Sequence, residues 1–380
     1  MNGKGRGTAL VIGGGIGGLA AAIGLHRTGW EVTVLERSDA LHDAGAGISL
    51  AANGIRALDV LGVGGAVRAA ARRQYTGGTR TPGGRWLSRM DGIALERALG
   101  IPMTGIPRAE LHRLLRAALP PAALRTGVTG SLDTALAAAD VVVAADGIRS
   151  TVRTRLFPGH PGPVYSGSTV LRAITAGPLP LDTDFELTWG PGAEFGHIAF
   201  TDGRAEWHAV LAAPAGIRHP DPLAALSRRF GGWHERVGRL LAATRPEDVL
   251  HHDVHELATP LPSFAAGRVA LLGDAAHAMT PNLGQGACQA LEDAVTLAAE
   301  LAAGPDVETS LARYDAVRRP RAQSVARAAR QAGRLGHGLS HPAAVYLRNL
   351  ALRTAPSAAT IRAILRHADW TPPALPARAV

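Results

Sequence analysis

Residues 269–293 read VALLGDAAHAMTPNLGQGACQALED, and the fold is organised around this stretch. Val269–Leu272 is a short apolar run of the kind that forms a buried strand. A Gly-Asp pair ends the strand, and a loop rich in glycine and proline follows, which no regular element is expected to hold. From Gln285 onward, apolar residues recur at helical spacing until a Gly-Pro pair ends the pattern. The strand therefore delivers Asp274, and the loop leads into a helix N-terminus whose unpaired N–H groups favour an anionic or polyhydroxyl ligand.

The amino-terminal segment also runs from an apolar strand through a glycine-rich loop into a helix. Thr8–Ile12 is a fully apolar strand, and Leu19–Arg27 is an apolar helix that a glycine ends. Glu31–Leu35 is the second strand. This strand–helix–strand unit is the local context that a dinucleotide-binding glycine loop needs.

A G-x-G-x-x-G motif lies between the first strand and the helix, with Gly13, Gly15 and Gly18 in its three places. The first glycine allows a tight turn, the second lets the backbone approach a pyrophosphate, and the third lets the helix and strand pack closely. Glu36 ends the second strand, where its carboxylate can accept hydrogen bonds from a ribose diol and would repel a 2′-phosphate. The motif predicts a bound dinucleotide, with NAD and FAD both open and NADP disfavoured at this site. Arg37 either covers the adenine or lies on the surface.

The bulk composition narrows the class of protein. The chain has 380 residues, and its single cysteine, Cys288, excludes an internal disulfide and a Cys₄ zinc site. The formal charge of +9 comes from arginines scattered without interleaved aromatics, so nucleic-acid binding is not expected. The chain starts with polar residues and lacks any apolar run of about 18 residues, which predicts no membrane span. A cytoplasmic protein is expected.

Two further segments carry charged residues that are candidates for ligand binding. Arg108–Leu119 is an amphipathic helix, and Arg108 at its start is electrostatically misplaced unless it meets an anion, so it faces either a ligand or solvent. Asp140–Ala145 is a buried strand that leads into DGIRS at Asp146–Ser150. This strand, like the one before Asp274, therefore ends in an Asp-Gly pair. Ser150 is placed to cap the next helix.

The rest of the chain is expected to add a second sheet and several helices. Val164–Leu211 alternates polar and apolar residues, which is typical of a mostly antiparallel sheet. A histidine cluster at His251, His252 and His255 lacks identifiable metal partners, so it predicts a polar strand edge and no metal site. The other expected elements are a strand over Ala44–Leu50, a hairpin over Tyr75–Met90, helices over Asn53–Leu61, Pro214–Arg245 and Leu311–Gly338, further helix through Ala363, and an irregular end over Asp369–Val380.

Three motifs stand in order along the chain: the glycine loop with Glu36, DGIRS at Asp146–Ser150, and GDAAHAMTPNLGQGACQALEDA at Gly273–Ala294. They resemble the single-component FAD-dependent aromatic hydroxylases, which are the para-hydroxybenzoate-hydroxylase-like flavoprotein monooxygenases, and most closely the salicylate-hydroxylase, urate-hydroxylase and zeaxanthin-epoxidase-like branch. The resemblance covers most of residues 8–330, and the third motif is its most specific part.

This resemblance implies an α/β fold in three parts. A Rossmann-like FAD-binding domain would carry an inserted, mostly antiparallel β-sheet domain for the substrate and a helical carboxy-terminal region. The expected ranges are 1–74, 98–163 and 265–330 for the FAD-binding domain, 75–97 and 164–264 for the substrate sheet, and 331–380 for the carboxy-terminal helices and tail.

By the same resemblance the dinucleotide is FAD, and NADH or NADPH is a transient reductant without a domain of its own. Asp274 would bind the ribityl–pyrophosphate region, Arg108 would lie along the cofactor, and Asp146 belongs to a motif implied in FAD and NAD(P)H binding. The glycine loop before the second helix would offer N–H groups to the flavin ring, whose reduced form is negatively charged. The full cofactor set implied is Gly13, Gly15, Ile16, Gly17, Gly18, Glu36, Arg37, Gly47, Arg108, Asp146, Asp274, Pro281, Gly284, Gly286 and Ala287.

The implied reaction is hydroxylation or epoxidation of a small, phenol-like aromatic molecule. NAD(P)H reduces FAD, the reduced flavin and O₂ form a C4a-hydroperoxide, and the substrate takes the terminal oxygen. The protein mainly positions the reactants and excludes water, so no dedicated catalytic residue is predicted. The candidate substrate residues, each with core or surface packing as the alternative, are Arg172, Trp189, Phe195, His197 and Met279.

The expected oligomeric state is a monomer or a homodimer. Two other functions also stay open on the sequence alone. One is a flavin-dependent reductase or dehydrogenase, against which the aromatic-hydroxylase form of residues 273–294 argues. The other is a flavin-binding protein without turnover. Its only support is the short segment Pro120–Ala139, because relatives have a longer, strand-rich stretch there that flanks the adenosine. A second departure, Ala144 in place of a common glycine, is expected to have little effect.

Overall fold

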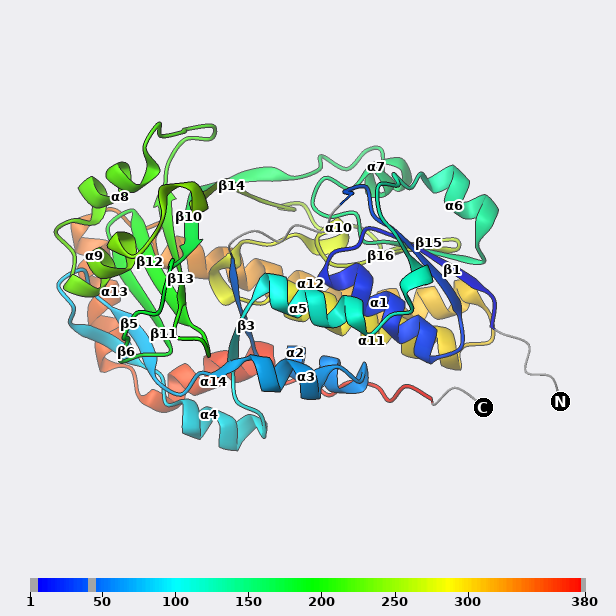
Figure 1. The fold of residues 1–380 in the computed structure, drawn as a ribbon, viewed down its shortest axis with the longest axis horizontal. Coiled ribbons are helices and arrows are strands. Elements are labelled where there is room, and N and C mark those ends of the chain that lie inside the picture. Colours follow the sequence, from blue (N-terminus) through cyan, green and yellow to red (C-terminus); the bar gives the residue numbers. More distant parts are fainter. Residues whose placement is uncertain (1–5, 40–45, 377–380) are drawn as a thin grey trace.

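The computed structural model describes residues 6–39 and 46–376, which form an elongated α/β molecule with a β-sheet at each end (Figure 1). The sheet near the amino terminus has six strands in the order β15–β16–β9–β1–β2–β8. Its strands are parallel except for the short edge pair β15–β16. They are β1 (Thr8–Ile12), β2 (Glu31–Leu35), β8 (Leu124–Arg125), β9 (Val141–Ala144), β15 (Ala265–Ala266) and β16 (Val269–Leu271).

The sheet at the other end has seven strands in the order β14–β10–β13–β12–β11–β5–β6. All its neighbouring strands are antiparallel except the pair β11–β5, so the mostly antiparallel inserted sheet is confirmed. Its strands are β5 (Gly77–Arg80) and β6 (Trp86–Arg89), which form the predicted hairpin, and β10 (Val164–Ile174), β11 (Phe185–Gly190), β12 (Ala193–Ala199), β13 (Ala205–Ala212) and β14 (Leu250–Glu256).

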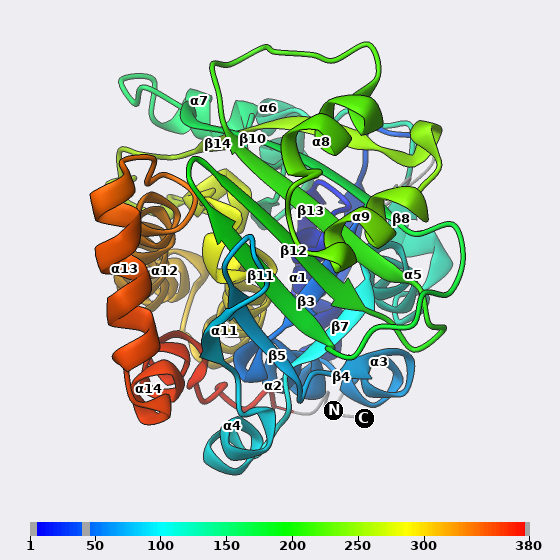
Figure 2. The ribbon, with the colours of Figure 1, turned by 90° about the vertical axis from the view of Figure 1, so that its left-hand side faces the viewer.

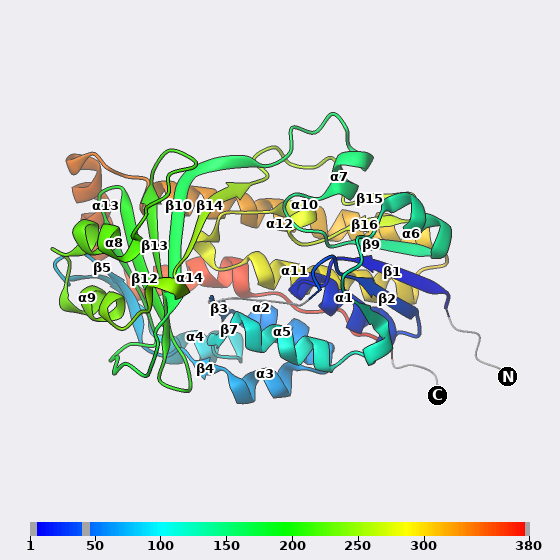
Figure 3. The same cartoon turned by 45° about the horizontal axis from the view of Figure 1, so that its top comes forward.

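A three-stranded sheet lies between the two larger sheets (Figure 3). It contains β3 (Gly47–Leu50), β4 (Arg72–Arg73) and β7 (Thr104–Pro107). The helices are α1 (Ile16–Arg27), α2 (Ala52–Val60), α3 (Gly64–Ala70), α4 (Gly92–Leu99), α5 (Arg108–Ala117), α6 (Leu132–Ala138), α7 (Thr151–Leu156), α8 (Pro222–Phe230), α9 (Glu235–Ala242), α10 (Asp274–His277), α11 (Gly286–Ala303), α12 (Val307–Leu335), α13 (Pro342–Thr354) and α14 (Ser357–Ala368), with short 3₁₀ turns at Pro121–Ala123, Pro246–Asp248 and Pro281–Leu283.

Small residues let α1 and α11 cross closely beneath the six-stranded sheet. A Cβ atom added at Gly17 would lie 3.2 Å from the Cβ of Ala290, and one added at Gly24 would lie 2.8 Å from the Cβ of Ala298. The first turns of the two helices therefore lie side by side. This contact brings the amino-terminal glycine loop next to the loop that precedes α11.

The seven-stranded sheet has an outer face and an inner face. Helices α8 and α9 cover the outer face (Figure 2), where Phe195 and Trp207 pack against Phe230 in a separate hydrophobic core. The inner face meets β3, because a Cβ atom at Gly47 would lie only 2.7 Å from the Cβ of Glu206. The strands put alternate residues on the two faces.

Several predicted elements need correction. The loop after Asp274 was expected to hold no regular element, but it contains α10 and a 3₁₀ turn, because short helical turns satisfy the backbone between the punctuating residues. The helical stretch predicted over Pro214–Arg245 is two short helices, α8 and α9, separated by Gly231-Gly232. Helix α12 begins at Val307 rather than Leu311, after an Asp306 cap. The strand predicted from Ala44 begins at Gly47, and residues 44 and 45 lie outside the described ranges.

The short segment Pro120–Ala139 folds onto the six-stranded sheet. Strand β8 pairs with β2, and α6 lies near β1 and β9. A groove of about 410 Å³ remains over one face of β1 and β2, lined by Thr8, Leu10, Thr33 and residues 128–131, among others. In residues 6–39 and 46–376, no helix is both long and apolar enough to cross a membrane.

Candidate functional site

In the glycine loop after β1, two glycines pack tightly against the protein backbone and a third does not. Gly13 has φ +107°, and a Cβ atom there would lie 2.3 Å from the Ala145 carbonyl oxygen. A Cβ atom at Gly18 would lie 1.9 Å from the Gly13 carbonyl oxygen. Gly15 differs, because no atom of the described residues lies within 4 Å of its Cβ position. Glycine is thus required at Gly13 and Gly18 by the protein itself, whereas Gly15 borders space that a ligand can fill.

Glu36 is held as an anion at the end of β2. Its Oε2 accepts a hydrogen bond of 2.7 Å from the Gly14 N–H, and its Oε1 accepts one of 2.9 Å from the Ser38 N–H. Burial alone would raise the pKa of Glu36, but these backbone donors outweigh it and keep the pKa below its usual value. The carboxylate is therefore an acceptor near a loop that opens onto free space.

Buried His112 on α5 supports the same loop, and sequence reasoning missed it. Its Nε2 donates to the Gly14 carbonyl oxygen at 2.7 Å. Arg108 begins this helix, and its backbone N–H donates to the Ala46 carbonyl oxygen at 2.9 Å, so α5 also fixes the entry to β3. A lone histidine inside an amphipathic helix has no sequence signature, which is why only the structure reveals it.

The loop between β16 and α11 is fixed from behind by a buried acid. Asp293 on α11 accepts hydrogen bonds from the Gly273 N–H at 2.9 Å, from His277 Nε2 at 2.6 Å and from Arg318 Nε at 2.8 Å. Burial would raise the pKa of Asp293, but the charges of His277 and Arg318 and these hydrogen bonds lower it to about 2. Asp274 follows Gly273 as the first residue of α10 and is exposed.

The N-terminus of α11 opens onto free space. Gly284 has φ +62°, and no atom in residues 6–39 and 46–376 lies within 4 Å of the Cβ position of Gly284 or Gly286. Within the same ranges, no side chain caps the helix. Buried Gln285 is held by Asn53 Nδ2, which donates to Gln285 Oε1 at 2.8 Å. An 18-residue helix therefore presents its first N–H groups and its dipole to an unobstructed region.

The DGIRS segment caps α7, and this helix contacts α10. Asp146 Oδ2 accepts from the Thr151 N–H at 2.9 Å, and Ser150 Oγ accepts from the Arg153 N–H at 2.9 Å, which confirms Ser150 as the cap of α7. The buried Arg153 side chain donates to the Ala275 carbonyl oxygen at 3.1 Å. Arg153 on α7 therefore holds α10, and no role was predicted for this arginine. Asp146 Oδ1 is buried and has no hydrogen-bond partner within the described ranges.

The other members of the predicted cofactor set occupy varied surroundings. Gly17 is needed for packing, since a Cβ atom there would lie 2.8 Å from Leu272 Cδ1. Gly47 allows β3 to approach the seven-stranded sheet. Ile16 is buried, Ala287 is half-buried, and Arg37 and Pro281 are exposed.

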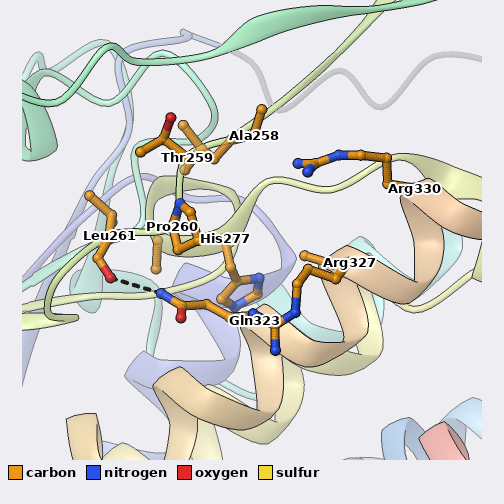
Figure 4. A pocket seen from close by; sticks show the side chains of 11 residues that line it. Ala258, Thr259, Pro260, Leu261, His277, Gln323, Arg327 and Arg330 are labelled. Atoms are coloured by element: carbon orange, nitrogen blue, oxygen red, sulfur yellow. Dashed lines mark hydrogen bonds between the residues drawn. The ribbon is translucent and has the colours of Figure 1, made fainter.

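A small cavity lies behind α10 (Figure 4). It has a volume of about 20 Å³, room for one water molecule, between residues 257–261 and α12. Gln323 Nε2 closes one side by donating to the Leu261 carbonyl oxygen at 2.8 Å. His277 reaches this cavity, and its buried Nδ1 has no hydrogen-bond partner in the described part of the chain.

A cluster of charged groups occupies the inner face of the seven-stranded sheet. His208 on β13 lies with its Nδ1 3.3 Å from Glu206 Oε2 and its Nε2 3.8 Å from Glu194 Oε1. Arg172 on β10 is its cross-strand neighbour. Gly196 on β12 makes room for the imidazole, because a Cβ atom there would lie 2.4 Å from His208 Nε2. Burial would lower the pKa of His208, but Glu206 and Glu194 outweigh it and raise the pKa.

The structure separates the five predicted substrate residues. Arg172 and Trp189 lie on the inner face, and Trp189 Nε1 donates to Glu194 Oε2. Phe195 lies on the outer face, where its ring stacks on Trp207 at a centroid distance of 5.6 Å. His197 lies on the same outer face, fully buried, and burial lowers its pKa to about 4. Met279 is half-buried after α10.

The three histidines of the predicted cluster lie on β14. His251, His252 and His255 lie along one strand, with His251 stacked on His219 at a centroid distance of 5.9 Å. Among the residues that the structure describes, no group of three or more histidine, cysteine, aspartate or glutamate side chains could hold a metal ion.

Comparison with known proteins identifies relatives over nearly the whole chain. The family described as FAD binding domain matches residues 6–129 and 122–329. The chain is 38% identical over 344 residues to aurachin C monooxygenase/isomerase of Stigmatella aurantiaca, with 87% of this chain and 89% of the relative covered. It is 30% identical over 354 residues to the FAD-dependent urate hydroxylase of Klebsiella pneumoniae, with 87% and 90% covered.

Solved structures show the same architecture. HpxO of Klebsiella pneumoniae complexed with FAD and uric acid superposes with a TM-score of 0.87 and 27% identity, covering 95% of this chain and 96% of that one. A salicylate hydroxylase substrate complex superposes with a TM-score of 0.71 and 25% identity, covering 94% and 98%. The resemblance expected from the sequence and the predicted fold class are confirmed.

Proposed function

The chain belongs to the FAD binding domain family and is an FAD-dependent monooxygenase, and we propose that it hydroxylates or epoxidises a small aromatic substrate with O₂ and with NADH or NADPH as the reductant. The observation that carries this proposal is the contact between Gly17 and Ala290, which places the first turns of α1 and α11 side by side. Each of these helices follows a glycine loop that borders open space. One extended dinucleotide can therefore contact both loops.

The residues present fit FAD. Gly15 leaves room for a pyrophosphate, Glu36 offers an anionic acceptor for a ribose, and Asp274 is exposed for the ribityl chain. The N-terminus of α11, which starts at Gly286, would stabilise negative charge on the reduced ring. The chemistry that FAD supplies when bound is acceptance of a hydride from the nicotinamide and activation of O₂.

We propose that the short Pro120–Ala139 segment still covers the adenosine end of FAD. The Val128 N–H donates to the Glu36 carbonyl oxygen at 2.9 Å, and the Gly127 N–H donates to the Ser38 carbonyl oxygen at 3.1 Å. The chain therefore runs beside the residues that follow β2. We propose that residues 127–130 and Arg37 flank the adenine.

We place the substrate on the inner face of the seven-stranded sheet. Arg172, Trp189 and His208 line this face, and Glu206 lies against β3, which belongs to the proposed cofactor site. We propose that neutral His208 takes the proton of a substrate hydroxyl: the O–H bond breaks, an N–H bond forms on the imidazole, and both electrons stay on the substrate oxygen. The resulting anion is a better electron donor to an electrophilic oxygen. Glu206 and Glu194 stabilise the imidazolium.

The reaction class can be tested on the purified holoenzyme. We expect a yellow protein that releases FAD on denaturation. Candidate phenols and hydroxylated nitrogen heterocycles are screened for stimulated NADH and NADPH oxidation, and ¹⁸O from ¹⁸O₂ is followed into the product. Label that enters from water alone, or oxidation that no aromatic candidate raises, would contradict the proposed oxygen transfer.

The role of His208 has its own test. We expect His208→Gln to lower kcat by about a hundredfold while FAD content stays unchanged, because general-base catalysis typically contributes 10²–10⁴. Wild-type kcat/KM should rise with pH as His208 loses its proton, and the variant should lose this rise. His252→Gln, on β14 and near Arg172, is the matched control. Identical pH profiles for wild type and His208→Gln would refute the assignment.

We further propose that the enzyme works in the cytoplasm, where NAD(P)H is available, as a monomer or homodimer. The single, buried Cys288 supports a reducing compartment.

A further inference from the structure

Helix α13 carries an apolar stripe that the rest of the described chain leaves uncovered. Tyr346, Leu347 and Leu350 expose 67%, 62% and 44% of their surfaces, and Leu335 at the end of α12 exposes 59%. Ala343 and Ala351 are exposed at helical spacing from them. Contiguous apolar surface of this kind usually marks an interaction site.

The opposite side of α13 is anchored, so the stripe has a fixed outward direction. Arg348 is 9% exposed, and its NH1 donates to the Gly336 carbonyl oxygen at 2.6 Å. Its guanidinium carbon lies 5.4 Å from the centroid of the Trp189 ring. Figure 2 shows α13 and α14 along one side of the molecule, away from α8 and α9.

Between the end of α12 and the end of α14, the charged residues of the sequence are all basic. No aspartate or glutamate occurs from Leu335 to Ala368. Arg353 follows Tyr346 by two helical turns and is exposed on the same side of α13. Arg362 and Arg366 are exposed one turn apart on α14.

We propose that the α13 stripe, flanked by these arginines, docks the enzyme on the surface of a membrane that contains anionic lipids. An amphipathic helix with leucine and an aromatic residue on one face and arginines beside it matches the chemistry of the lipid interface. A symmetric contact with a second copy fits less well, because residues 335–368 carry arginines but no carboxylate that could pair with them across such a contact. This inference does not depend on the identity of the substrate.

Vesicle co-sedimentation of the holoenzyme tests the proposal. The probes are vesicles of phosphatidylcholine alone and of phosphatidylcholine with phosphatidylglycerol, at low and high salt. The test variants are the triple change Tyr346→Ser, Leu347→Ser and Leu350→Ser, and the triple change Arg353→Gln, Arg362→Gln and Arg366→Gln. The matched control is Val317→Ser on α12, where the valine is 51% exposed. Flavin absorbance and circular dichroism verify that each variant is folded.

We expect the wild type to bind the anionic vesicles and to be released by salt. The serine variant should partition about tenfold or more weakly, because it no longer buries its apolar side chains. The glutamine variant should lose its preference for anionic vesicles, and Val317→Ser should bind like the wild type. Failure of the wild type to bind, or equal binding by the serine variant, would overturn the proposal. A wild-type dimer that the serine change converts to a monomer, without vesicle binding, would show instead that the stripe joins two copies.

Discussion

The Asp293 carboxylate accepts a hydrogen bond of 2.9 Å from the Gly273 backbone N–H, so the helix that presents Gly286 also fixes the end of the strand that presents Asp274. The same carboxylate binds His277 and Arg318, and all three partners, Gly273, His277 and Arg318, are buried. Two parts of the cofactor site are thereby coupled through one acid behind the site. A change at Asp293 acts on both parts at once without contacting a ligand.

Replacement of this acid should damage both the fold and FAD retention. In Asp293→Asn, Arg318 and His277 lose a buried counter-charge, and we expect a loss of about 3 kcal/mol or more in the free energy of unfolding. Urea unfolding of the holoenzyme and its FAD content measure the effect. Asp306→Asn, which changes an exposed helix cap, should leave both nearly unchanged, because asparagine also caps helices. An Asp293→Asn protein with the wild-type urea midpoint would contradict this role.

Two glycines of one motif should respond differently to the same change. Gly18→Ala puts a Cβ atom 1.9 Å from the Gly13 carbonyl oxygen, so we expect the apoprotein itself to be destabilised. The methyl group of Gly15→Ala meets no atom within 4 Å in the part of the chain that the structure describes, and Gly15 has φ −71°, which alanine adopts freely. Apoprotein stability should therefore be unchanged by Gly15→Ala, while FAD affinity falls because the added methyl group occupies the proposed pyrophosphate space.

Denaturation of the apoprotein and titration with FAD separate these outcomes. Equal FAD affinity for Gly15→Ala and wild type would show that the cofactor backbone passes elsewhere.

The cofactor half of the molecule was predictable because its signals are local. A glycine loop needs a preceding strand and a following helix, and Glu36 needs only to end the next strand, so short stretches of sequence carry the inference. The buried partners of these loops were not predictable. His112, Arg153 and Asp293 act across long sequence separations, and each looks like an ordinary helical residue in the sequence.

The substrate half was harder because strand alternation does not identify which face a residue takes. Every residue of β12 is buried, so neither burial nor polarity distinguishes Phe195 and His197 on the outer face from Glu194 and Gly196 on the inner face. Phe195 and His197, the two residues of β12 predicted to contact the substrate, therefore lie on the face away from the proposed substrate site. Only the position of α8 and α9 over one face shows that the polar cluster around His208 lies on the other.

Burial of neutral His197 makes stability depend on pH. Its pKa is about 4 in the folded protein and about 6.5 when unfolded, so the unfolded state binds more protons between these values and stability falls as pH falls. We expect His197 to contribute a loss of about 2 kcal/mol between pH 8 and pH 5. Urea unfolding at several pH values measures this loss, and His197→Gln should reduce it. A loss of the same size in the variant would assign the pH dependence to other histidines.

The tight contact between Gly196 and His208 offers a way to displace the imidazole without removing it. A Cβ atom at Gly196 would lie 2.4 Å from His208 Nε2 and 2.7 Å from Leu187 Cδ2, so Gly196→Ala forces the histidine away from its place beside Glu194. We expect kcat to fall at least tenfold while FAD content is retained, because displacement of a reacting group by about 1 Å costs up to 10²-fold in rate. Steady-state kinetics with an active aromatic substrate measure kcat, and flavin absorbance measures FAD content. Gly238→Ala, where the added methyl group meets open space on α9, is the control and should match the wild type. Wild-type turnover in Gly196→Ala would mean that the position of His208 does not matter for the reaction.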